Sequence, residues 1–212
     1  MHSENSPDDQ SAITKKSFIE QARRAQIVDA TIRVLAERGY VNTSFSRIAK
    51  EAGISASLIS YHFKSKEELT EAVYASIVQE RQAHIAAQLA SAKTASDKLR
   101  IRLEADLAHM GTRPELFQAL VEILFVARTK TEPESHRNDD VHADFVSIAA
   151  ILKEGQANGE FGDFDAFNIA IIIDSARDGF LGQLAGHPEF DLEQFTKTLI
   201  NTVFVIIKKE QL

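Results

Sequence analysis

A hydroxyl-rich run followed by an aromatic and basic run occupies residues 52–69, which read AGISASLISYHFKSKEEL. Ser55, Ser57 and Ser60 carry short hydroxyl side chains, and Tyr61 opens a Tyr-His-Phe run that is followed by lysines. Short side chains let a helix backbone approach base edges in the major groove. Phenol, imidazole and ammonium groups suit phosphate oxygens. This chemistry predicts a helix that lies against nucleic acid.

The candidate contacts fall into two sets. One set on the expected helix suits base edges, with alanine able to touch a thymine methyl group: Ser55, Ala56, Ser57 and Ser60. The other set suits phosphates, either where that helix ends or where the helix before it begins: Thr43, Ser44, Arg47, Tyr61, His62, Lys64 and Lys66. The alternative is a helical hairpin in which Tyr61 and His62 are merely half-buried.

The elements around this run predict a helix-turn-helix. Apolar residues recur with helical period between Phe18 and Arg38, and Gly39 follows at the usual position for a helix end. The residues NTS offer N-caps for a second helix over about 45–52. A glycine then separates it from a third helix, which begins after Ser55 and ends near residue 63.

The net charge of −7 is unevenly distributed. Residues 1–14 contain three acids and no Lys or Arg, and their polar composition predicts a disordered tail. Residues 15–66 contain ten Lys and Arg against four acids, hence +6, whereas residues 67–212 contain fourteen against twenty-four, hence −10. The sequence thus predicts a basic DNA-binding domain over 15–66 and a larger acidic domain over 67–212 that a polyanion would repel.

Composition excludes several classes of protein. The 212 residues contain no cysteine, which rules out disulfides and cysteine-based zinc sites and is compatible with a cytoplasmic location. No apolar run approaches the roughly 18–20 residues of a membrane span, and the N-terminus lacks the pattern of a secretory signal. No nucleophile with a base, carboxylate pair or glycine-rich phosphate loop is evident, so we expect neither an enzyme nor a cofactor.

The remaining pattern is that of an all-α protein. A capping box formed by Ser65 and Glu68 begins a helix that continues to about residue 90 and joins the two domains. No alternating strand pattern is evident. Further helices are expected over residues 95–110, 114–129, 139–157, 164–184 and 191–209.

Residues 20–70 closely resemble the DNA-binding domain of the TetR family of transcriptional regulators. The segment TSFSRIAKEAGISASLISYHFKSKEEL carries the features I-A-x-x-A-G and Y-H-F-K-x-K-x-x-L, and RRAQIVDATIRVLAERGY is similar to the first helix of that family. The resemblance implies phosphate contacts by Thr43, Tyr61, His62 and Lys66 and base contacts by Ala56, Ser57 and Ser60. Many members have an aromatic residue in place of Ser60, and Leu58 is bulkier than is usual, so no relative's operator can be transferred to this chain.

The resemblance also implies an effector site and a dimer interface in the larger domain. RPELFQALVEILFVART and EGQANGEFGDFD are similar to the C-terminal domain of the BetI-like subgroup. The pocket candidates are polar or large residues within apolar helical runs: His109, Met110, Arg113, Phe117, Phe125, Arg128, Asp174, Arg177 and Asp178. Internal pairing of the aspartates with the arginine in AIIIDSARDGF is the alternative.

The last two helices are the predicted dimer interface. One offers small residues and the other mainly apolar ones, namely Ala176, Gly179, Gly182, Phe195, Leu199, Thr202 and Ile206, with Val203 adjoining. A helix pair packed within one chain is the alternative. His136 and Asp140 have a spacing compatible with a metal site. Acidic residues are also favourable at the start of a helix, which accounts for the same residues, so we expect no metal site.

Together these features predict a ligand-responsive DNA-binding transcriptional regulator. It would be a repressor that binds a palindromic operator as a homodimer and is released by a small-molecule effector. The alternative is an architectural DNA-binding protein that has no effector.

Overall fold

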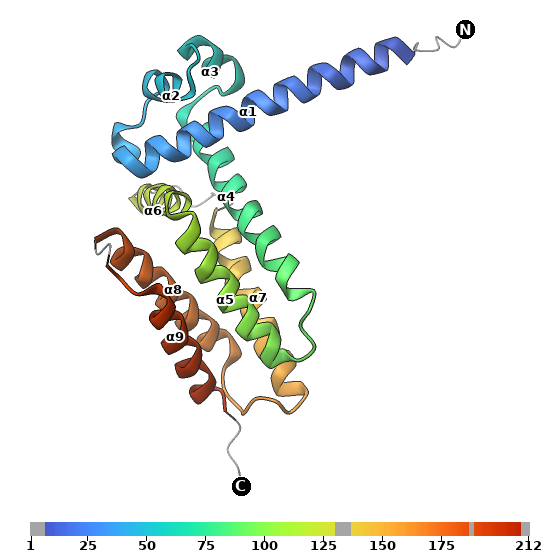
Figure 1. Cartoon of the computed structure of the whole chain (residues 1–212), viewed down its shortest axis with the longest axis vertical. Helices are drawn as coiled ribbons and strands as arrows, with labels where there is room; N and C mark the ends of the chain where they lie inside the picture. Colours follow the sequence, from blue (N-terminus) through green and yellow to red (C-terminus); the bar gives the residue numbers. More distant parts are fainter. Residues whose placement is uncertain (1–6, 130–136, 187–188, 209–212) are drawn as a thin grey trace. The chain divides into compact units, whose positions relative to one another are not determined.

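A computed structural model describes the backbone of residues 7–129, 137–186 and 189–208, and the side chains of residues 17–125, 145–180 and 189–208. The fold is all-α, as predicted (Figure 1). Within the described ranges the helices are α1 (Pro7–Asn42), α2 (Phe45–Ala52), α3 (Ala56–His62), α4 (Lys66–Leu89), α5 (Ala95–Thr112), α6 (Pro114–Thr129), α7 (Arg137–Ala157), α8 (Ala166–Gly186) and α9 (Leu192–Ile206). None of these helices is long and apolar enough to cross a membrane.

The chain divides into two compact units. Unit 1 comprises Met1–Ile77 and Ala119–Ala127, and unit 2 comprises Val78–Gln118 and Arg128–Leu212. The sequence placed the end of the DNA-binding domain at residue 66. Unit 1 also includes the first turns of α4, where Leu69 and Val73 are completely buried. The sequence also did not indicate that part of α6 belongs to unit 1.

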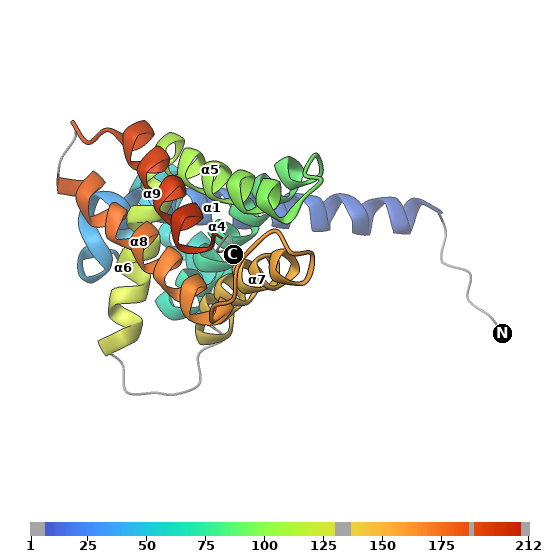
Figure 2. The same ribbon diagram turned by 90° about the horizontal axis from the view of Figure 1, so that it is seen from below.

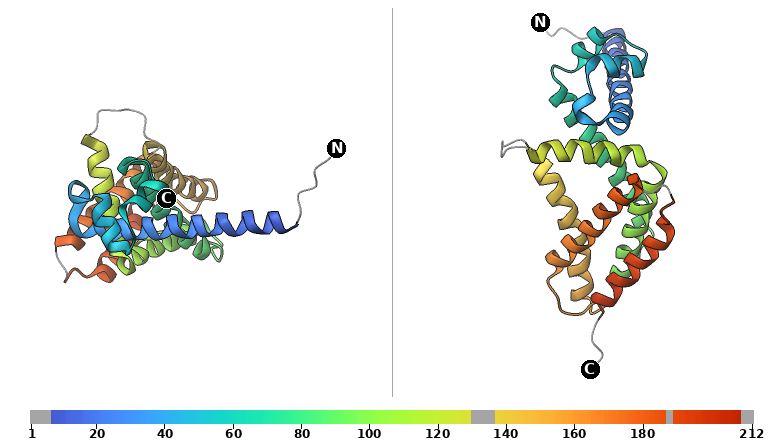
Figure 3. Two further views of the ribbon diagram at one scale, coloured as in Figure 1. Left: turned by 90° about the horizontal axis from the view of Figure 1, so that it is seen from above. Right: turned by 90° about the vertical axis from the view of Figure 1, so that its left-hand side faces the viewer.

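Unit 1 is built on α1, which packs against α2, while α2 packs against α3 (Figure 3). Its core consists of apolar side chains with no exposed surface, including Ile27, Leu35, Ile48, Ile59 and Phe63. α1 begins at Pro7, whereas the sequence predicted a disordered tail over residues 1–14. A proline followed by acidic residues is favourable in a first helical turn, because proline lacks the N–H and carboxylates favour the positive end of the helix dipole.

Glycines interrupt or end helices of unit 1 at the positions that the sequence predicted. α1 is interrupted at Gly39, where φ is 72°, and α2 ends at Gly53, where φ is 66°. A residue with a Cβ is strained at such positive φ values. Ser44 caps α2 by accepting the Arg47 N–H, and Ser55 caps α3 by accepting the Leu58 N–H at 3.2 Å. These local signals account for the close agreement between the expected and observed bounds of α2 and α3.

Unit 2 is a layered helical bundle in which α5 packs against α7 and α9, and α7 packs against α8 (Figure 2). Thr94 and Asp97 form a capping box at the start of α5. The carboxylate of Glu160 accepts two further N–H groups there, from Ala95 at 3.0 Å and Ser96 at 2.9 Å. An acidic side chain from the segment between α7 and α8 thus satisfies the free donors of a distant helix end.

Candidate nucleic-acid interface

α3 has one buried face and one polar face. Ile59 and Phe63 have no exposed surface, whereas the hydroxyl side chains of Ser55, Ser57 and Ser60 are exposed. The polar face therefore carries hydroxyl groups over the whole of this short helix. It has the residue types that close approach to base edges requires.

Local hydrogen bonds orient these hydroxyl groups. The oxygens of Ser55 and Ser57 lie 2.9 Å apart, and the Ser60 hydroxyl donates to the Ala56 carbonyl at 3.2 Å. A hydroxyl oxygen has two lone pairs, so the Ser60 oxygen can still accept from a base amino group. Ala56 itself is half-buried.

The end of α3 places an aromatic and a basic side chain in solvent. Tyr61 is 72% exposed, and its ring meets the half-buried His62 ring edge-on at 5.0 Å between centroids. Lys64 is exposed as well. The helical-hairpin alternative predicted that both Tyr61 and His62 are half-buried. Only His62 is half-buried in the structure.

Arg24 of α1 fixes this end of α3. It donates to the His62 carbonyl, its guanidinium lies 4.0 Å from the Phe63 ring centroid, and it is 3.8 Å from the Glu68 carboxylate. The sequence did not identify Arg24 as a functional residue, because its partners lie far along the chain. The adjacent basic residues at positions 23–24 were a feature of the sequence that could have pointed to this role.

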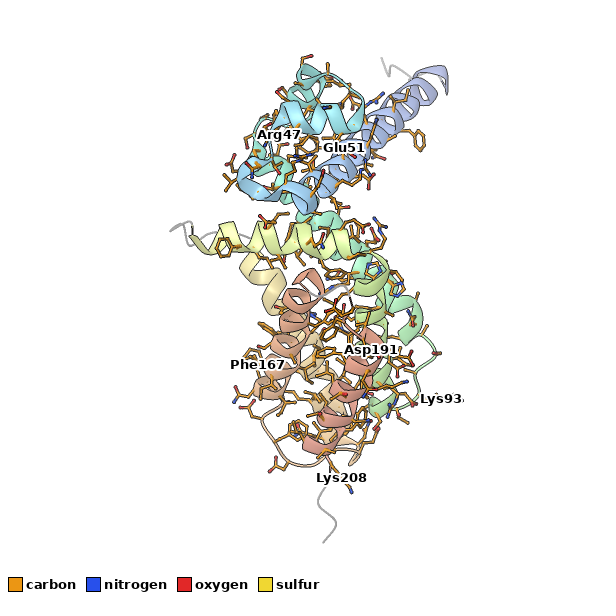
Figure 4. The ribbon with its side chains drawn as sticks, turned by 60° about the vertical axis from the view of Figure 1, so that its left-hand side comes forward. Arg47, Glu51, Lys93, Phe167, Asp191 and Lys208 are labelled. Carbon is orange, nitrogen blue, oxygen red and sulfur yellow. The ribbon has the colours of Figure 1, made fainter. Side chains whose placement is uncertain are left out.

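α1 also holds α2 in place. Gln26 Nε2 donates to the Ala52 carbonyl at 2.9 Å, and Arg33 Nε donates to Glu51 Oε1 at 2.6 Å. Glu51 and Arg47 both lie on α2 (Figure 4). The long first helix is therefore the platform that positions both short helices.

The phosphate candidates before and at the start of α2 differ in exposure. Ser44 and Arg47 are exposed. Thr43 is 3% exposed, and its hydroxyl donates to the Gly39 carbonyl at 2.8 Å. The Thr43 hydroxyl proton is therefore already engaged in a hydrogen bond within unit 1, in the turn that leads into α2.

Lys66 is half-buried at the first position of α4. Its Nζ donates to the Tyr40 carbonyl and lies 3.8 Å from the Tyr40 ring centroid. Because an ammonium group has three donors, this bond is compatible with a phosphate contact. The capping arrangement nearby differs slightly from the predicted box, since Glu68 accepts the N–H of Lys64 at 2.8 Å.

Unit 2 contains a buried ionic cluster, which we define as Arg81 of α4, Arg102 and Asp106 of α5, and Asp174 and Arg177 of α8. All five are less than 9% exposed. Arg177 lies 3.0 Å from Asp106 Oδ2 and 2.5 Å from Asp174 Oδ1, and Arg81 lies 3.7 Å from Asp106 Oδ1. Internal Asp–Arg pairing, the alternative that the sequence left open, is therefore present.

Burial and charge shift the pKa values of this cluster in opposite directions. Burial would raise the pKa of Asp106, but the guanidinium groups of Arg177, Arg81 and Arg102 together hold it below its ordinary value. Burial raises the pKa of Asp174 despite Arg177 beside it. Burial lowers the pKa of Arg81 to about 10. The arginines of the cluster thus keep Asp106 in its ionised form.

His109 adjoins the cluster, one turn from Asp106 on α5. Its ring stacks on His84 at 4.8 Å and meets Phe117 edge-on at 5.9 Å. It is 6% exposed, and Glu80 Oε1 lies 3.7 Å from its Nε2. Burial lowers the pKa of His109, which favours the neutral ring.

The other predicted ligand residues differ in exposure and in their partners. Met110 is fully buried, Arg113 is half-buried and bonded to Glu115 and Glu80, and the Asp178 side chain is 52% exposed beside Arg177. Phe125 belongs to unit 1 and is 67% exposed. The Arg128 side chain lies outside the described residues.

The sequence did not identify Arg81, Arg102 and Asp106. Arg81 lies on the apolar face of α4 between Ile77 and Ile85, four residues from each, which was a usable signal. Among the described side chains no cluster of three or more His, Asp or Glu could hold a metal ion. The side chains of His136 and Asp140 lie outside the described residues.

α3 is an exposed polar helix held by α1 and α2, and residues 15–66 around it carry a net charge of +6. These features are those of a DNA-binding protein of the helix-turn-helix class. Residues 27–73 match the family model described as bacterial regulatory proteins, tetR family. The HTH-type transcriptional regulator BetI of Cronobacter sakazakii is 34% identical over 194 residues, which cover 90% of this chain and 92% of that protein. The chain therefore belongs to the TetR family and is a DNA-binding transcriptional regulator.

Solved structures show the same fold. A transcriptional regulator from Saccharomonospora viridis in complex with choline aligns with a TM-score of 0.80 and 24% identity, over 90% of this chain and 100% of that one. FadR from Bacillus subtilis in complex with stearoyl-CoA aligns with a TM-score of 0.73 and 21% identity, over 84% and 96% of the respective chains.

Proposed function

We propose that the protein is a repressor that binds a palindromic operator as a homodimer and is released from it by a small-molecule effector. The observation that carries the proposal is the exposed hydroxyl face of α3 with Tyr61 and Lys64 at its end, held by a fully buried opposite face. One helix of this length reads few bases, so two half-sites about 34–36 Å apart are needed for useful affinity and specificity.

Exposed faces of α8 and α9 support the dimer. On α8, Ile172 is 55% exposed, and a Cβ on Gly179, two turns further on, would meet no described heavy atom within 4 Å. On α9, Val205 is 74% and Ile206 is 48% exposed. Apolar and small residues in water on adjacent helices favour association with a second copy.

Two of the residues that the sequence assigned to the dimer interface are buried within the chain. Leu199 is 9% and Val203 is 4% exposed. The intrachain packing that the sequence left as an alternative therefore accounts for these two residues. Thr202, Ile206 and the neighbouring Val205 remain in the proposed interface.

Buried polar atoms in unit 2 support an effector site. Within the described side chains, neither Asp106 Oδ1 nor His109 Nε2 has a hydrogen-bond partner. Buried polar atoms without partners are costly, and a ligand that donates hydrogen bonds would satisfy both. Because one structural neighbour was solved with choline, choline is the first effector to test.

The decisive experiment is fluorescence anisotropy of the full chain on the DNA upstream of its own gene, with a scrambled duplex of equal length as control. A regulator binds the upstream DNA and keeps it at higher salt while it releases the scrambled duplex. Equal, salt-sensitive binding to both would instead indicate the architectural alternative.

Single substitutions test the assigned DNA-binding face. Lys64→Ala is expected to lower the slope of log K against log salt by about 0.9, because one phosphate contact is lost. Tyr61→Ala is expected to weaken binding to the operator and to the scrambled duplex alike, with little change in slope, because the phenol is neutral. Lys93→Ala removes an exposed lysine between α4 and α5 and serves as the control (Figure 4). If Lys64→Ala and Tyr61→Ala both bind like the control, another face meets the DNA.

Addition of choline to the operator complex tests the effector. Operator affinity is expected to fall by about 5- to 150-fold at saturation, the range typical of allosteric coupling. Stearoyl-CoA added in the same assay is the comparison. Release by stearoyl-CoA alone would overturn the assignment of a small cationic effector, and release by neither would favour the architectural alternative.

A further inference from the structure

The backbone of Tyr40 is held from two sides in unit 1. Its N–H donates to Glu122 Oε2 of α6 at 2.8 Å. Its carbonyl accepts from Lys66 Nζ of α4, and the same ammonium lies over the Tyr40 ring. Three helices therefore meet at one residue, directly after the interruption of α1 at Gly39.

The Glu122 carboxylate lies beside a helix end that disfavours its charge. It is so close to the C-terminal end of α1 that a Cβ on Gly39 would lie 2.9 Å from its Oε2. A helix carries partial negative charge at its C-terminus, which disfavours the carboxylate and favours the Lys66 ammonium at the Tyr40 carbonyl. The hydrogen bond from the Tyr40 N–H offsets the unfavourable placement of Glu122.

Tyr40 leads directly into the candidate phosphate contacts. The Thr43 N–H donates back to the Tyr40 carbonyl at 3.1 Å, and the Thr43 hydroxyl donates to the Gly39 carbonyl at 2.8 Å. Ser44 follows and caps α2. The position of Tyr40 therefore sets where the first turn of α2 begins.

We propose that Glu122 is a positioning residue for DNA binding. Through the Tyr40 N–H it holds the turn at the end of α1, and with it the start of α2 and Lys66, in the arrangement that binds the operator. The inference rests on the proposed operator contacts of Ser44, Arg47 and Lys66. Glu122 itself contacts no DNA, because a carboxylate is repelled by phosphate.

The test compares operator affinity in Glu122→Ala and Glu122→Gln with the wild type. Glu122→Ala removes the acceptor of the Tyr40 N–H and is expected to weaken operator binding about tenfold. Glu122→Gln keeps an acceptor oxygen and is expected to stay within about threefold of the wild type. Gln118→Ala changes an exposed residue one turn earlier on α6 and is the matched control.

Charge and positioning predict opposite results for this substitution. Loss of one negative charge by itself tightens binding to a polyanion, so weaker binding by Glu122→Ala identifies positioning. A double-mutant cycle with Lys66→Ala is expected to be non-additive, because both residues hold Tyr40. Tighter or unchanged binding by Glu122→Ala would overturn the proposal.

Amide hydrogen exchange at Tyr40 gives a readout that needs no DNA. The Tyr40 N–H is expected to exchange faster in Glu122→Ala than in the wild type, because its acceptor is lost. Equal exchange in the two proteins would overturn the proposal even if the operator were bound. Failure of the proposed function has a different signature, since the wild type itself would then bind no operator.

Discussion

Asp106→Asn is expected to lower the free energy of unfolding by about 3–5 kcal/mol, because it leaves buried guanidinium groups without their main counter-ion. Asp106 lies 3.0 Å from Arg177 and 3.7 Å from Arg81, and all three are buried. The amide keeps the shape of the carboxyl group, so loss of charge rather than a cavity causes the effect. Denaturant unfolding followed by circular dichroism measures the loss.

The control for this variant is Glu104→Gln, an exposed acid two residues earlier on α5. Surface charges of this kind contribute less than about 1 kcal/mol, so its unfolding midpoint should match the wild type. A loss of less than about 1 kcal/mol in Asp106→Asn would show that Arg81 and Arg177 are not balanced by Asp106.

The difference in stability between the wild type and Asp106→Asn is expected to depend on pH. Because the folded pKa of Asp106 is held below its ordinary value, its contribution is fully present above the unfolded value of about 3.9 and is lost as the pH falls through the folded pKa. The stability difference between wild type and Asp106→Asn should therefore be constant from pH 7 to about pH 5. It should shrink as the pH falls below about 4.

Gly179→Arg is expected to convert the proposed dimer to a monomer and to weaken operator binding by about 100-fold or more, because two linked half-sites gain that factor from avidity. Among the described residues, a Cβ at Gly179 would meet no heavy atom within 4 Å, so the described part of the chain leaves space where the new side chain starts. A second copy packed on α8 would not. Sedimentation velocity measures the dimer, and anisotropy measures the affinity.

Ala86→Arg is the matched control, since it adds the same charge at an exposed position of α4. An added positive charge favours DNA binding in both variants, so weaker binding by Gly179→Arg alone cannot be a charge effect. A Gly179→Arg protein that stayed dimeric and bound the operator normally would exclude this face of α8 from the interface.

The sequence by itself determined the helices and the DNA-binding class. Ser44 and Ser55 cap α2 and α3, and Gly39 and Gly53 take the positive φ angles that end the helices before them. Each of these signals acts within a few residues of the chain, through capping bonds and Cβ sterics. Local sequence was therefore sufficient to predict the polar face of α3.

Only the tertiary structure decided which charges meet. The Tyr40 N–H and Glu122 are 82 residues apart, and Arg177 and Asp106 are 71 residues apart, in each case on different helices. Helical periodicity predicts which face of a helix is buried but not which helix packs against it. Unit 1 thus combines a polar helix, α3, that local rules predict with Arg24 and Glu122, whose partners meet them only once the helices have packed. The ionic cluster within unit 2 likewise forms only through packing.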